Sequence, residues 1–150
     1  MIGHLAKANE HWRCAPCEAL AVFHGPHAYL SPTWYGEPGF VPTWNYCAVH
    51  VAGTLRKIDD PQRAAAIIRE LVHFYESPMP QPWTIDPPDQ FENLMTGIVA
   101  FEIEVTHMDG QWKLSQNHSH ERQARVAEQL KQGDANAREI AVLIERNLAK

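Results

Sequence analysis

The sequence lacks any apolar run long enough to cross a membrane. No stretch approaches the roughly 20 residues that a transmembrane helix needs. His4, Lys7 and Glu10 interrupt the opening segment before an apolar stretch can develop, which excludes a signal peptide. The sequence therefore predicts a soluble, cytoplasmic protein that does not bind membranes.

Cysteine is scarce, with three residues in 150. An odd number does not suit a secreted disulfide framework, so we expect reduced thiols. Cys14 and Cys17 have CxxC spacing, but they precede a predicted strand and no second CxxC follows. A structural zinc site needs four ligands, and a redox CxxC normally begins a helix, so we expect neither a metal site nor a redox centre here.

Basic residues are also too few for a nucleic-acid-binding surface. Lys and Arg number 13 against 18 Asp and Glu, the net charge is -5, and the two signs are interspersed. Binding to DNA usually requires a basic face that neutralises phosphates, so we do not expect direct nucleic-acid binding. The length and the 45% hydrophobic content predict a single domain over residues 1–150 with its own core.

The first half of the sequence predicts β-structure. Residues 18–25 and 27–31 are short apolar and aromatic runs, and Gly25-Pro26 predicts a turn between them. A loop rich in glycine and proline follows over residues 32–42. Residues 43–55 are the strongest predicted strand, because β-branched and aromatic side chains dominate them.

A helix is predicted after this strand, with Asp60 as its cap and Pro61 in its first turn. Its apolar residues recur at helical spacing, so one face should pack on a sheet; these are Ala64, Ile68, Leu71, Val72 and Tyr75. Residues 77–88 are rich in proline and predict an irregular surface crossing.

The second half predicts a hairpin and two helices. Residues 98–108 and 111–115 read as strands joined by a tight turn at Asp109-Gly110. Helices follow near residues 119–132 and 134–148. The predicted fold class is α+β, with a mainly antiparallel sheet, one crossover helix and C-terminal helices.

Three stretches of this sequence resemble the PaiB-like family of FMN-binding proteins. They are HLAKANEHW at residues 4–12, VFHGPHAYLSPTWY with VPTWNY within residues 22–46, and KLSQN at residues 113–117. The resemblance implies an FMN-binding split barrel that forms a homodimer with the flavin at its interface. Met1 falls directly before the strand that holds His4, so we expect the first barrel strands of that family to be missing from this sequence.

The predicted flavin site centres on KLSQN. If this segment is extended, Lys113, Ser115 and Asn117 share one face, while Trp112 and Leu114 turn to the core. An ammonium, a hydroxyl and an amide suit an anionic or amide-rich ligand such as FMN. Together with the family-like stretches, this predicts ten cofactor-binding residues: Lys113, Ser115, Gln116, Asn117, Asn45, Trp44, Thr43, Tyr46, Trp34 and His4. The residues alone leave open a solvated strand end with Asn117 as a helix cap, and rings that only pack in the core.

The resemblance implies an FMN-binding protein that acts as a negative transcriptional regulator by an indirect route. One alternative is a flavin-dependent oxidoreductase acting on a small molecule; another is a dimeric structural domain that has lost the cofactor. We find no convincing catalytic acid, base or nucleophile, so any redox chemistry would belong to the flavin.

Overall fold

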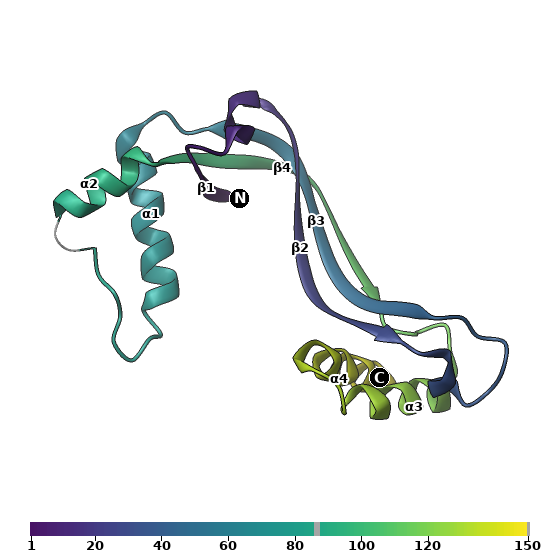
Figure 1. Cartoon of the computed structure of the whole chain (residues 1–150). Helices are drawn as coiled ribbons and strands as arrows, with labels where there is room; N and C mark the ends of the chain where they lie inside the picture. Colours follow the sequence, from purple (N-terminus) through teal and green to yellow (C-terminus); the bar gives the residue numbers. More distant parts are fainter. Residues whose placement is uncertain (86–87, 150) are drawn as a thin grey trace. The chain divides into compact units, whose positions relative to one another are not determined.

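The computed structural model describes residues 1–85 and 88–149 (Figure 1). An antiparallel sheet of four strands has the order β1-β4-β3-β2, with β1 at Ile2–Ala6, β2 at Cys17–Leu30, β3 at Thr43–Lys57 and β4 at Ile98–Lys113. The helices are α1 (Pro61–Glu76), α2 (Pro88–Thr96), α3 (His120–Leu130) and α4 (Ala135–Leu148), with two short 3-10 helices, η1 (Glu10–Cys14) and η2 (Pro32–Tyr35). The predicted α+β split-barrel class is confirmed.

The strands are longer than the turn signals predicted. The expected turn at Gly25-Pro26 is wrong, because β2 runs through both residues. Since β2 is an edge strand, Pro26 can sit in it without removing a central ladder hydrogen bond. The expected hairpin at Asp109-Gly110 is also wrong, because β4 continues to Lys113 and Gly110 does not have the positive φ that such a turn requires.

The chain divides into two compact units, which we describe separately. Unit 1 contains Met1–Leu20 and Val51–His107, and unit 2 contains Ala21–His50 and Met108–Lys150. The strands β2, β3 and β4 each contribute residues to both units. The single domain over residues 1–150 stays a prediction.

Unit 1 joins the ends of the sheet to α1 and α2. β1 pairs antiparallel with β4, and His4 lies opposite Ala100. The side chain of Asp60 caps α1, and Pro61 begins that helix, as predicted. Its core contains Ile58, Ala64, Ile67 and Ala100, with Leu71 and Met95 packed against them. Tyr75, which we expected on the packed face, is 64% exposed.

Two segments of unit 1 differ from the predictions. The proline-rich crossing at residues 77–88 is irregular as far as residue 85 and ends where α2 begins, at Pro88; residues 86 and 87 lie outside the described part of the chain. Cys14 and Cys17 form a disulfide, so the expectation of reduced thiols is wrong for this pair. The remaining thiol, Cys47 in unit 2, is free and buried, and this burial raises its pKa.

Unit 2 packs two antiparallel-looking helical segments, α3 and α4, into a shared apolar core. Ser119 and Asp134 cap these helices with their side chains, close to the predicted boundaries. Val126, Leu130, Ile140 and Ile144 are fully or almost fully buried. The same core includes Leu30 and Tyr35 from the β2–β3 side and Leu114 from the segment after β4. Among the described residues, no helix is long and apolar enough to cross a membrane.

Candidate functional site

A polar cavity of about 300 Å³ lies in unit 2, where β3 begins and β4 ends. We call it the polar cavity. Five of the ten predicted site residues line it, together with aromatic and small residues of the neighbouring loops. Its lining is Tyr35, Gly39, Phe40, Val41, Thr43, Asn45, Lys113, Ser115, Asn117 and His118. The volume is at the lower end of the about 300–1,000 Å³ typical of ligand pockets.

Asn45 and Ser115 are the buried polar pair of this cavity. They are 1% and 4% exposed. The amide Nδ2 of Asn45 donates to Ser115 Oγ over 3.0 Å, and Ser115 Oγ lies 3.4 Å from Asn45 Oδ1. A buried amide costs free energy unless its groups are bonded, and one hydroxyl cannot saturate a group with two donors and an acceptor. The pair therefore retains hydrogen-bonding capacity next to the cavity.

The backbone at Ser115 differs from the extended row that we predicted. The strand ends at Lys113, and Ser115 has a φ of 63°, in the left-handed region that a residue with a Cβ seldom adopts. Gln116 braces this bend: its Oε1 accepts the N–H of Leu114 over 2.7 Å, and its Nε2 donates to the carbonyl of Trp112 over 2.6 Å. Gln116 thus supports the site without lining the cavity.

The bend also decides where the flanking residues lie. Leu114 is buried as predicted, but Trp112 is 51% exposed, so its predicted place in the core is wrong. Lys113 and Asn117 reach the same cavity as Ser115, although they do not form an extended row with it. The ammonium of Lys113 donates to Thr43 Oγ1 over 2.6 Å, which places a positive charge at the exposed side of the cavity.

Aromatic rings form the opposite wall. The ring of Tyr35 lies 4.6 Å from those of Phe40 and His118, measured between centroids. Arg122 holds this wall from outside, since its guanidinium lies 5.0 Å from the centre of the Phe40 ring and donates to Glu37 over 3.3 and 2.5 Å. The hydrogen bond from Arg122 lowers the pKa of Glu37. We had not predicted His118 as a site residue, because its HxH spacing with His120 suggested only a solvated helix entrance.

The pKa of His118 makes unit 2 sensitive to pH. Burial, and then the charge of Arg122, lower this pKa from 6.5. Below pH 6.5 the unfolded chain therefore binds more protons at this residue than the folded chain does, so the free energy of unfolding should fall as the pH drops toward the lowered pKa. Urea unfolding between pH 7.5 and 5.5 should show this slope, and His118→Gln should flatten it. The exposed His120→Gln serves as the control; an equal effect of both variants would contradict the assignment.

The other predicted residues lie elsewhere. Alternation along β3 puts Trp44 and Tyr46 on the face opposite to Thr43 and Asn45. Trp34 and Trp44 line a different cavity of unit 2, about 560 Å³ in volume, beside the turn between α3 and α4. Tyr46 donates from its hydroxyl to Gln111 Oε1 over 2.9 Å. His4 lies exposed on β1 in unit 1, so the structure does not gather all ten residues at one place.

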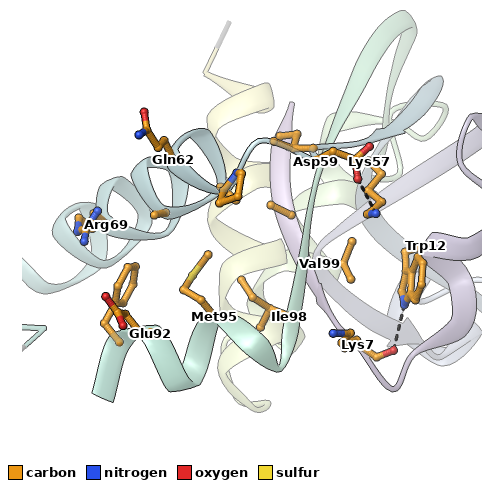
Figure 2. Close-up of a pocket in the computed structure, with 16 residues that line it drawn as sticks. Lys7, Trp12, Lys57, Asp59, Gln62, Arg69, Glu92, Met95, Ile98 and Val99 are labelled. Carbon is orange, nitrogen blue, oxygen red and sulfur yellow. Dashed lines mark hydrogen bonds and ion pairs between the residues drawn. The ribbon is translucent and has the colours of Figure 1, made fainter. Parts of the chain in front are cut away.

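Unit 1 contains a larger cavity that the sequence did not predict. It measures about 620 Å³ and lies between α1, α2 and the beginning of β4 (Figure 2). We call it the apolar cavity, because Ile58, Ala64, Phe91, Val99 and Ala100 are buried around it. The lining residues come from segments far apart in the sequence, so no local motif identified it. No cluster of three or more potential metal ligands was found among the residues that the structure describes.

Comparison with known proteins gives three relevant similarities. A family model described as "Putative FMN-binding domain" matches residues 1–107. The chain is 37% identical over 153 residues to the Bacillus subtilis protein named "Protease synthase and sporulation protein PAI 2", covering 99% of this chain and 73% of that protein. It is 32% identical over 116 residues to an uncharacterized protein of Emericella nidulans, and 43% identical over 68 residues to one of Saccharomyces cerevisiae.

The extent of these matches differs between the two cavities. The Emericella and Saccharomyces matches cover 66% and 40% of this chain but only 46% and 39% of those proteins, so the chain spans less than half of their length. All residues of the apolar cavity lie within the 1–107 match. The polar cavity takes Lys113, Ser115, Asn117 and His118 from beyond it, in the part that only the Bacillus match covers among these three.

Proposed function

The chain belongs to the FMN-binding family whose model matches residues 1–107 and is PaiB-like, and from this premise we propose that its FMN rests in the polar cavity of unit 2. The observation that carries this placement is the convergence of Lys113, Asn45 and Ser115 on one cavity with the rings of Tyr35 and Phe40. FMN requires a cation or donors for its phosphate, hydrogen bonds for its pyrimidine edge and apolar cover for its rings. The residues present fit these needs.

Each group would have a distinct part in holding the cofactor. The ammonium of Lys113 would meet the phosphate as a charge-assisted donor, with the amide of Asn117 beside it. The buried pair of Asn45 and Ser115 would bond the pyrimidine edge, where a desolvated amide gives specificity. Tyr35 and Phe40 would cover the ring system. The bound flavin would supply the electron-transfer chemistry, while these residues bind and orient it.

Substitution of Lys113 tests the placement. Lys113→Ala should weaken FMN binding about tenfold or more, because a hydrogen bond to a charged group is lost. Titration of the purified chain with FMN, followed by flavin absorbance and tryptophan emission, measures this affinity. The matched control is Lys131→Ala, which removes a lysine of unit 2 that pairs with Glu128 and Glu145 outside the cavity. Unchanged affinity in Lys113→Ala would remove this residue from the site.

A homodimer with the flavin at its interface is the second part of the proposal. The strands of unit 2 expose an unusual number of large apolar side chains, and a monomer seldom leaves such groups uncovered. These are Phe23 at 51%, Tyr29 at 46%, Trp44 at 53%, Met108 at 62% and Trp112 at 51% exposed. The rings of Tyr29 and Trp44 lie 5.9 Å apart, so part of this set is contiguous.

Sedimentation equilibrium should therefore give twice the chain mass. Trp44→Glu should shift the protein to monomer and weaken FMN binding at the same time, since a charge at a dimer interface is costly to desolvate. Phe74→Glu, at an exposed ring on α1, is the control that should remain dimeric. A monomeric wild-type chain that binds FMN fully would contradict an interfacial flavin.

Regulation by an indirect route is a second candidate function, supported by the sporulation protein among the relatives. Direct contact with DNA is not favoured by α4, where Arg138 and Arg146 alternate with Glu139 and Glu145. Retention on nonspecific DNA at low salt would overturn this expectation. The cytoplasmic location and any reaction of the flavin stay predictions.

A further inference from the structure

The apolar cavity of unit 1 has the composition of a second ligand site. Its floor comes from the beginning of β4 and from α1, with Ile98, Val99 and Ala64 among its residues. Met95 and Phe91 of α2 close one side of it. At about 620 Å³ it lies well within the range of pockets that hold small organic molecules.

Charged groups stand at its ends. Figure 2 shows Lys7 and Trp12 at one end and Arg69 and Glu92 at the other, with Met95 and Ile98 between them. The third cation, Lys57, pairs with Asp59 over 2.5 Å. Three cations against two carboxylates leave one positive charge around an apolar centre.

That charge is assigned to Lys7 by the contacts of the other two cations. Lys57 has its carboxylate partner, and the guanidinium of Arg69 lies 4.5 Å from the centre of the Phe91 ring. Among the described residues, the ammonium of Lys7 has neither a hydrogen bond nor an ion pair, while its carbonyl accepts from the indole of Trp12 over 3.0 Å. This hydrogen bond holds the backbone of Lys7 next to an aromatic ring.

We propose that the apolar cavity binds a small aromatic carboxylate, with its ring against Met95 and Ile98 and its carboxylate on the Lys7 ammonium. A monoanion matches the single unbalanced cation, and an aromatic ring matches walls made of an indole, a phenyl group and a thioether. This site lies in the other unit from the proposed flavin site, so it does not depend on where FMN binds.

The test uses 2-naphthoate as the probe and 2-naphthalenemethanol as its neutral analogue, with binding measured by calorimetry on the chain saturated with FMN. Naphthoate should bind with a dissociation constant below about 1 mM and about tenfold more tightly than the alcohol, because only the carboxylate meets an ammonium. Lys7→Gln should remove this difference. Ala65→Trp, which fills the cavity from α1, should abolish binding of both compounds while circular dichroism shows a folded chain.

Lys113→Ala provides the matched control, because it should weaken FMN binding and leave naphthoate binding unchanged. Failure of naphthoate to bind, or binding that ignores both Lys7→Gln and Ala65→Trp, would overturn the proposal. Displacement of naphthoate by FMN, mole for mole, would also overturn it, because the apolar cavity would then be the flavin site. If the chain does not bind FMN at all, the naphthoate titration still decides this inference by itself.

Discussion

Asn45→Leu is expected to destabilise the chain by about 1–3 kcal/mol and to weaken FMN binding about tenfold or more. Leucine has nearly the same volume as asparagine but cannot bond to the hydroxyl of Ser115, which is 4% exposed. A buried hydroxyl without its partner carries the full cost of its desolvation. Urea unfolding and FMN titration measure the two effects separately.

The double variant Asn45→Leu with Ser115→Ala separates stability from ligand binding. Replacing both members of a buried hydrogen-bonded pair by apolar groups is nearly neutral for stability, so most of the lost unfolding free energy should return. FMN affinity should stay low, because the cavity has then lost both its amide and its hydroxyl. Recovery of FMN affinity along with stability would show that the pair is purely structural.

Ile140→Ala should have the largest effect on folding, about 2–5 kcal/mol in the free energy of unfolding. Ile140 is 0% exposed and lies in the core that includes Tyr35 and Leu114, so truncation leaves a void beside the wall of the polar cavity. Urea denaturation of the purified variant measures this loss.

Val142→Ala is the matched control for this substitution. Val142 is on the same helix α4 but 44% exposed, and its truncation should change the free energy of unfolding by no more than about 0.5 kcal/mol. Comparable losses in both variants would mean that the core of unit 2 is not centred on Ile140.

Some features follow from short stretches of sequence because their physical cause is local. Asp60 with Pro61, Ser119 and Asp134 mark helix starts, since a capping side chain bonds the free backbone N–H groups of the adjacent turn. Alternation along β3 requires Thr43 and Asn45 to share a face, and both line the polar cavity. The family resemblance likewise rested on consecutive residues, and the family model and the Bacillus relative confirm it.

Other features were decided by contacts between segments that are distant in sequence. Gly25-Pro26 and Asp109-Gly110 carry turn signals, but both lie inside long strands, because sheet pairing outweighs a weak local preference. The left-handed backbone of Ser115 is held by Gln116 and Asn45, so a strict alternation misplaced Trp112. Pairing of hydrogen bonds across the fold therefore overrode the local pattern.

The amino-acid sequence alone determined the class of this protein, its cofactor family and the polar residues at the end of β4, because these depend on residue types in consecutive positions. Only the tertiary structure decided that Asn45 meets Ser115 across 70 positions, that His118 joins a ring cluster, and that Lys7 lies at the end of an apolar cavity. Such contacts depend on the free energy of burying and pairing groups from separate segments, which no local spacing records.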